Sequence, residues 1–112
     1  LEPRADSGWR LRFAPGTPAL PQGSGASLGE LGRRLAGQPD GRVTVIAQVA
    51  GPAEDVSTAR RLALARGLAV KAALVAGGLE ETRIDIRPLG RTEEATDAAD
   101  ILPPAPPRER AR

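Results

Sequence analysis

Three segments of the chain have the pattern of apolar and polar residues that is typical of β-strands. Residues 9–13 (WRLRF) alternate apolar and basic side chains, which predicts a strand with one buried face. Residues 43–49 (VTVIAQV) are rich in β-branched residues and are flanked by glycines, which predicts the best-defined strand. Residues 82–89 (TRIDIRPL) alternate again, and Pro88 predicts a sheet edge or a bend at their far end. Residues 100–102 are a candidate for a fourth, shorter strand.

A helical pattern of leucines lies between the first two strands. Leu28, Leu31 and Leu35 recur at spacings of three and four residues, so they form one apolar face. Ser27 and Glu30 have the spacing of a capping box, in which a hydroxyl and a carboxylate satisfy free backbone N–H groups. We therefore expect a helix from Ser27 to about Ala36.

A longer helix is predicted between the second and third strands. Asp55 is a suitable N-cap, and Gly77-Gly78 supplies a stop signal after Ala76. The elements then follow the order β-α-β-α-β, with a candidate fourth strand. Helices that alternate with strands favour an α/β fold, an α+β sandwich in which two helices cover one face of a mixed sheet.

The pattern predicts one domain with a loose segment at each end. We expect the domain to span residues 9–102 and residues 1–8 to be flexible. Residues 103–112 (PPAPPRERAR) are proline-rich and charged and have no side chains to bury, so we expect a disordered tail.

Composition argues against several classes of function. The chain has no Cys and no His, so it lacks thiolate nucleophiles, disulfides and the usual proton shuttle and metal ligands. We therefore expect no enzymatic activity and no cofactor or metal. The formal net charge is only +2, and one Trp and one Phe offer few rings for base stacking, so we expect no nucleic-acid partner.

Arg66 is the most specific candidate for a binding residue. At about 100° per residue, it lies in the middle of an apolar stripe of the long helix formed by Ala59, Leu62, Ala63, Ala69, Val70 and Ala73. A guanidinium beside apolar surface needs oxygen partners, because an unpaired buried charge is costly. One alternative is a structural pair with Glu54, Asp55 or a loop carbonyl. The other is that Arg66 holds the carboxylate of a ligand through its planar fork.

The sequence around Arg66 resembles the OmpA-like domain of bacterial envelope proteins. That family typically reads Asn-x-x-Leu-Ser-x-x-Arg-Ala-x-x-Val, followed by Leu, Gly and a strand that begins Arg-Ile. The residues that resemble it are Leu62–Val70 (LALARGLAV), Leu74, Gly78-Leu79 and Arg83-Ile84, and upstream Phe13 and the loop to Leu20. The resemblance covers roughly residues 9–102.

The resemblance implies a non-catalytic domain of the bacterial periplasm or cell envelope that grips peptidoglycan non-covalently. In the family, an Asp after the central strand and the helix Arg hold the diaminopimelate of the stem peptide. Arg66 matches that Arg, but Ala50 and Gly51 stand where the Asp is expected, and Glu54 and Asp55 are the candidate substitutes. The family's later Asn-Arg-Arg-Val appears as Asp-Ala-Ala-Asp at residues 97–100, so most ligand-holding residues are missing. Any membrane anchor is expected outside this chain.

A second apolar stripe indicates a different partner. Leu64, Leu68 and Val75 lie roughly 160–200° around the helix from Arg66, so they face outward if Arg66 faces the sheet. An exposed stripe suits a contact with another envelope protein or a homodimer, whereas a structural alternative packs it on the first helix. The second hypothesis is therefore an interaction or oligomerisation module that kept the fold and lost peptidoglycan binding.

Overall fold

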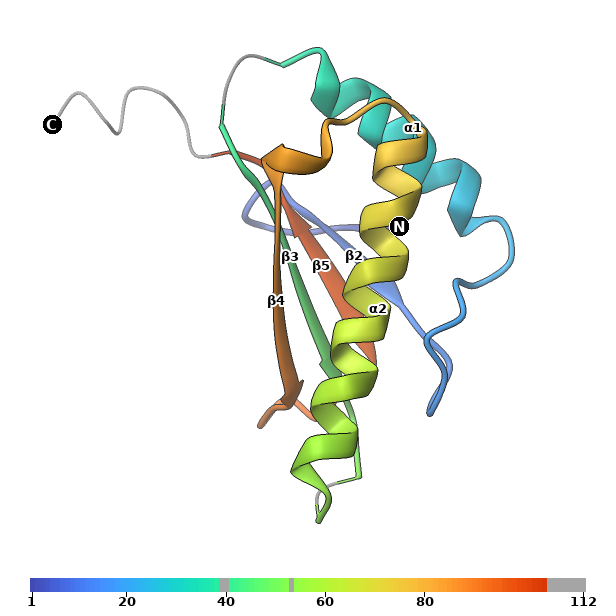
Figure 1. Ribbon diagram of the computed structural model, residues 1–112, viewed down its shortest axis with the longest axis vertical. Helices are drawn as coiled ribbons and strands as arrows, with labels where there is room; N and C mark the ends of the chain where they lie inside the picture. Colours follow the sequence, from blue (N-terminus) through green and yellow to red (C-terminus); the bar gives the residue numbers. More distant parts are fainter. Residues whose placement is uncertain (39–40, 53, 105–112) are drawn as a thin grey trace, which may run out of the picture.

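A five-stranded mixed sheet forms one layer of the domain (Figure 1). The computed structural model describes residues 1–38, 41–52 and 54–104. The strands are β1 (Glu2–Pro3), β2 (Trp9–Arg12), β3 (Val43–Val49), β4 (Ile84–Arg91) and β5 (Ala98–Leu102). Their spatial order is β1-β2-β5-β3-β4, with β3 and β4 parallel and the other pairs antiparallel. The candidate strand near residue 100 is therefore real, and it lies between β2 and β3.

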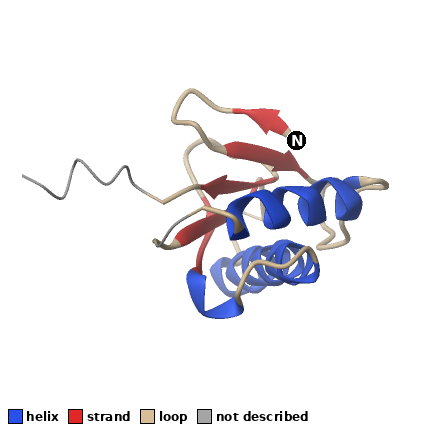
Figure 2. Ribbon diagram, turned by 90° about the horizontal axis from the view of Figure 1, so that it is seen from above, coloured by secondary structure: helices blue, strands red, loops and turns tan. Residues whose placement is uncertain are grey.

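Two helices form the second layer. They are α1 (Ser24–Ala36) and α2 (Val56–Ala76), and Figure 2 shows both on the same side of the sheet. A short 3-10 helix, η1 (Glu81–Arg83), leads into β4. The α/β fold class predicted from the sequence is confirmed. Within the described ranges, no helix has both the length and the apolar character that crossing a membrane requires.

The core lies between these two layers. Alternate residues of β3 point toward the helices, and Val43, Val45, Ala47 and Val49 are completely buried. They meet the leucines of α1 and the small residues of α2, because a strand with one buried face places every second side chain in the core. Thr44 and Ile46, which point to the uncovered face of the sheet, are only half-buried.

Glycines let the two helices approach each other closely. A Cβ added at Gly32 would lie 2.3 Å from the carbonyl oxygen of Leu74, and one added at Gly77 would lie 1.9 Å from that of Gly29. Where α2 faces the sheet, a Cβ at Gly67 would lie 2.6 Å from Cγ2 of Ile86 in β4. Because real Cβ atoms do not approach other atoms this closely, these glycines fix how tightly α2 packs against α1 and against the sheet.

The two helices differ in how well the sequence predicted their starts. Asp55 caps α2 as predicted, and its side chain accepts a hydrogen bond from the backbone N–H of Thr58. The capping box predicted for Ser27 and Glu30 is wrong, because α1 begins three residues earlier, at Ser24. Its N-cap is Gly23, which has a φ of 84°, a left-handed conformation that glycine adopts without strain.

β4 is an edge strand with a bulge at the predicted proline. Ala47 of β3 pairs with Pro88 and Gln48 pairs with Gly90, so Leu89 is an extra residue in β4. The prediction that Pro88 marks a sheet edge or a bend is confirmed on both counts. At the other edge, where the sequence predicted no element, Glu2–Pro3 pairs with β2. Within the predicted tail at 103–112, residues 105–112 lie outside the described part of the chain.

Candidate functional site

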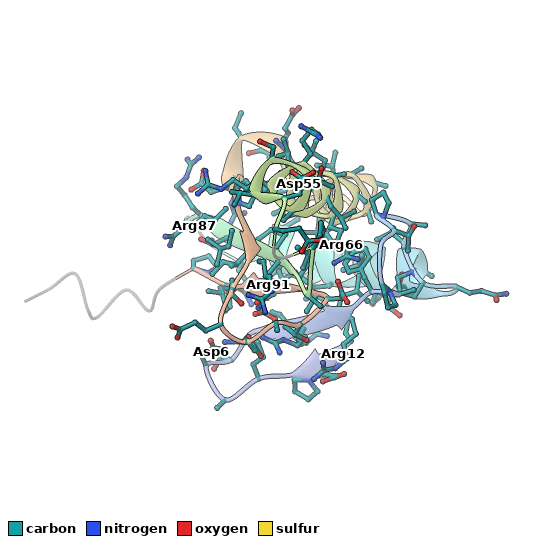
Figure 3. The ribbon with its side chains drawn as sticks, turned by 90° about the horizontal axis from the view of Figure 1, so that it is seen from below. Asp6, Arg12, Asp55, Arg66, Arg87 and Arg91 are labelled. Carbon is teal, nitrogen blue, oxygen red and sulfur yellow. The ribbon has the colours of Figure 1, made fainter. Side chains whose placement is uncertain are left out.

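Arg66 is completely buried at the interface between α2 and the sheet. The apolar stripe around it faces the sheet, since Ala59, Ala63 and Val70 are buried as well. Its guanidinium lies near the end of β3, at the end of the molecule where α2 begins. Figure 3 looks onto this end and labels Arg66 and Asp55.

The guanidinium binds two separate segments of the chain through hydrogen bonds to three backbone carbonyl groups. Nε donates to the carbonyl of Thr17 at 2.9 Å, and Nη2 donates to that of Ala14 at 2.9 Å, both in the loop after β2. Nη1 donates to the carbonyl of Gln48 near the end of β3 at 3.1 Å. Loop carbonyls were one of the structural partners considered for this residue, and they are found here.

The carboxylate partner of Arg66 is Asp97. Nη1 also donates to Oδ1 of Asp97 at 2.8 Å, and the Asp97 side chain is only 13% exposed. The same Oδ1 accepts the backbone N–H of Ala50 at 3.0 Å, and the Asp97 carbonyl accepts the N–H of Phe13 at 3.0 Å. Asp97 therefore joins the loop before β5 to the residues just after β3 and β2 and to α2.

Phe13 completes the surroundings of the buried charge. The Cζ atom of Arg66 lies 4.9 Å from the centre of the Phe13 ring, within the range of a cation–π contact. This ring and the acceptors of four hydrogen bonds from the guanidinium replace the water that the charged group lost on burial. The arrangement makes Arg66 the point at which the loops at this end are held together.

Glu54 and Asp55 are located away from this ion pair, at the exposed start of α2. Oδ1 of Asp55 accepts the backbone N–H of Thr58 at 3.0 Å, and Oδ2 accepts the Thr58 hydroxyl at 2.7 Å. These two hydrogen bonds, the backbone one first, lower the pKa of the Asp55 carboxyl below its ordinary value. The acid that pairs with Arg66 in this structure is therefore Asp97, and Asp55 serves as the cap of α2.

A second polar network covers the open face of the sheet next to the same end. Arg10 binds both carboxylate oxygens of Asp100, at 2.7 and 3.0 Å, and also donates to Glu94 at 2.7 Å. Glu94 accepts a hydrogen bond from the side-chain amide of Gln48 at 3.0 Å, and Arg4 pairs with Asp100 at 2.8 Å. The hydrogen bond from Arg10, and then that from Gln48, lower the pKa of Glu94. This network fixes the loop that carries Asp97 from its other side.

The apolar stripe on the outer side of α2 is exposed. Leu64, Leu68 and Val75 are 42%, 49% and 38% exposed. Leu68 and Val75 line a shallow hollow of about 300 Å³ together with Lys71 and Glu81. Contacts between α1 and α2 use other residues, such as Leu74 of α2 and its C-cap Gly77.

Asp97 and Asp100 are the residues of this region that sequence analysis did not single out. Both lie in the segment that stands where the resembling family has Asn-Arg-Arg-Val, and both carry a carboxylate there. An available signal was the pair of outward-facing arginines in the first strand, which need acids on a neighbouring strand. The neighbour of β2 is β5, in which Asp100 pairs with Arg10.

Comparison with known proteins identifies the family to which this chain belongs. The model of the OmpA family matches residues 12–102, so the chain belongs to the OmpA family. The matched region contains both helices, Arg66 and Asp97, and all the strands except the two-residue β1 and the first residues of β2. No curated protein sequence matches the chain.

Solved structures share the fold at low sequence identity. The chain is similar to the peptidoglycan-associated lipoprotein of Burkholderia pseudomallei, with a TM-score of 0.72, 16% identity and coverage of 83% of this chain and 87% of that one. For the C-terminal domain of Helicobacter pylori MotB, the TM-score is 0.75 at 13% identity, and the match covers 92% of this chain and 89% of that one. For an outer membrane protein of Borrelia burgdorferi, the TM-score is 0.72 at 11% identity, and the match covers 93% of this chain and 95% of that one.

Proposed function

We propose that this chain is a non-catalytic domain of the bacterial cell envelope that associates non-covalently with peptidoglycan. The observation that carries the proposal is the match of the OmpA family model to residues 12–102. It is supported by the similarity to a Burkholderia lipoprotein whose name describes it as peptidoglycan-associated. The proposed location is the periplasm, where peptidoglycan is found.

The proposed binding region is the end of the domain at which α2 begins. Three loops meet there, at residues 14–17, 50–52 and 92–97, and hydrogen bonds to Arg66 and Asp97 hold them together. A set of loops fixed by a rigid scaffold is a common location for binding residues. Glu54 and Asp55, exposed at this end, remain candidates for ligand contacts.

A direct role of Arg66 in holding the diaminopimelate carboxylate of the stem peptide remains a prediction with a specific requirement. Its guanidinium is fully buried and already paired with Asp97 at 2.8 Å. A ligand carboxylate would therefore have to displace the Asp97 carboxylate. Asp97→Asn removes the competing charge while keeping the shape of the side chain, so it should increase binding if this exchange takes place.

Sedimentation with purified peptidoglycan sacculi tests the proposal. The wild-type domain should pellet with sacculi and stay in solution without them, and Asp97→Asn measures the role of the Arg66 fork. Leu64→Ser, on the outer side of α2 and 42% exposed in the wild type, is a matched control that should pellet like the wild type. A folded wild-type domain that stays in the supernatant would end the proposal.

The second candidate function is a protein-interaction module, and the exposure of Leu64, Leu68 and Val75 favours it. An aliphatic stripe of this kind is suited to a flat apolar contact with a second copy of the chain or with another envelope protein. Full burial of one such side chain is worth about 1.5–3 kcal/mol, so three could drive a weak to moderate association.

Sedimentation velocity tests self-association on this stripe. The wild-type domain should show a dimer at high concentration, and Leu68→Glu should shift it to the monomer while leaving the fold intact. Val56→Glu is the matched control, because Val56 is 64% exposed on the same helix but outside the stripe. A wild-type domain that is monomeric at high concentration would exclude the dimer. The interaction function would then require a different envelope protein as the partner of the stripe.

A further inference from the structure

A small cleft lies beside the proposed binding region, on the β4 side of α2. It has a volume of about 160 Å³, and its lining comes from the loop after β3, the first turns of α2 and the end of β4. The lining residues are Pro52, Val56, Ala59, Arg60, Leu89 and Arg91. Among the described residues that line this cleft, none is acidic and none belongs to the Arg66–Asp97 pair.

Two arginines give the cleft a positive charge that the described residues do not neutralise. Nε of Arg91 donates to the carbonyl of Ala50 at 3.1 Å, which is a neutral acceptor. Among the described residues, no ion pair includes Arg60 or Arg91. The carboxylate of Asp55, on the same helix as Arg60, is occupied by the N–H and hydroxyl of Thr58.

The bulge of β4 lies against the start of the Arg60 side chain. Gly90 has a φ of 75°, and a Cβ built on it would lie 3.1 Å from Cγ of Arg60. The Arg60 side chain therefore packs against the residue that immediately precedes Arg91. Figure 3 shows Arg91 on the end of the molecule that also presents the start of α2. Both arginines line the cleft, and a guanidinium group is well suited to binding a carboxylate.

The size and the apolar lining of the cleft limit the kinds of ligand that fit it. A volume of about 160 Å³ is small, so the cleft suits a carboxylate with one small side chain better than a disaccharide. Val56 and Leu89 are 64% and 43% exposed at the cleft, so they offer an apolar surface to that side chain. A peptide that ends in alanine combines these two groups.

We propose that the Arg60–Arg91 cleft binds the terminal carboxylate and the terminal methyl-bearing residue of a peptidoglycan stem peptide. This inference rests on the proposed function and adds a second contact, separate from Arg66. The cleft and the loops around Arg66 share the segment at residues 50–52. A single stem peptide could therefore contact both regions.

The test uses a soluble probe, N-acetyl-D-Ala-D-Ala, titrated into the folded domain at low salt and followed by NMR. We expect backbone shifts at Val56, Arg60, Leu89 and Arg91, and a loss of affinity of about tenfold when the probe carries a C-terminal amide. Arg60→Gln and Arg91→Gln should each weaken binding by a similar factor. Arg61→Gln is the matched control, because it removes the same charge from the adjacent position on α2 and should leave the affinity unchanged.

The outcomes separate this inference from the proposed function. Equal affinity for the acid and the amide, or equal losses with Arg60→Gln and Arg61→Gln, would overturn the cleft as a carboxylate site. A double variant, Arg60→Gln with Arg91→Gln, that pellets with sacculi as well as the wild type would also overturn it and would leave peptidoglycan association standing. Specific binding of the acid probe by a domain that does not pellet with sacculi would instead overturn peptidoglycan as the source of the carboxylate.

Discussion

Nη1 of Arg66 lies 2.8 Å from Oδ1 of Asp97, and these two residues, 31 positions apart, form the buried ion pair that joins α2 to the loop before β5. The pair is not isolated, because Arg66 also binds three carbonyl groups and Asp97 also binds the N–H of Ala50. Removal of one partner from a buried and fully hydrogen-bonded pair leaves the other uncompensated.

Replacement of the arginine should therefore be strongly destabilising. We expect Arg66→Ala to lower the free energy of unfolding by about 3–5 kcal/mol, measured by urea denaturation. Arg61→Ala, an exposed arginine on the same helix, is the control and should change it by less than about 0.5 kcal/mol. If Arg66→Ala were as mild as the control, Arg66 would not hold the loops together.

Replacement of the aspartate should create a site for an added carboxylate. Asp97→Ala leaves the guanidinium and the Ala50 N–H without their shared acceptor. The Asp97 side chain is 13% exposed in the wild type, so we expect its loss to leave room for a small anion. Sodium formate should raise the melting temperature of Asp97→Ala more than that of the wild type. Sodium chloride at the same ionic strength controls for screening. Equal responses to both salts would show that Arg66 does not accept an external carboxylate there.

The close approach of the two helices predicts that Gly32 cannot be replaced by a larger residue without loss of stability. Gly32→Ala would place a methyl group 2.3 Å from the Leu74 carbonyl oxygen, a backbone atom that cannot move alone. We expect it to lower the free energy of unfolding by about 1–3 kcal/mol despite the better helix propensity of Ala. Gly25→Ala is the matched control on the same helix, because among the described residues no atom beyond its own helical neighbours lies within 4 Å of its added Cβ. The control should be neutral or stabilising, and a loss as large as that of Gly32→Ala would contradict the packing.

How much the sequence could predict depended on how local each feature is. The start and end of α2 were predictable because Asp55 and Gly77 are themselves the cap residues. The burial of Arg66 followed from the apolar stripe around it on a single helix. The start of α1 was missed because a left-handed Gly23 replaces a side-chain cap, so the Ser27 and Glu30 signal was false. The Asp97 partner was missed because its contact depends on how two distant loops meet, which helical periodicity does not encode.

The pH dependence of stability should include a contribution from Asp55. Its folded-state pKa is lowered from 3.8, first by the Thr58 backbone hydrogen bond and then by the Thr58 hydroxyl. Because the folded pKa lies below the unfolded one, the carboxylate stabilises the fold above the unfolded value, and this effect is lost as the pH falls through the folded value. Asp55→Asn keeps the cap without the charge, so it should lose less stability between about pH 6 and about pH 3. Urea denaturation at both pH values checks this, and equal losses in variant and wild type would refute it.

The most direct test of peptidoglycan association is a titration of the isotope-labelled domain with soluble peptidoglycan fragments, followed by residue-resolved NMR. The proposal predicts that the shifted backbone signals cluster at residues 14–17, 50–52 and 92–97 and at the first turn of α2. It also predicts that Leu64, Leu68 and Val75, on the outer side of α2, are unaffected. Absence of shifts at saturating fragment, or shifts confined to that outer stripe, would contradict it.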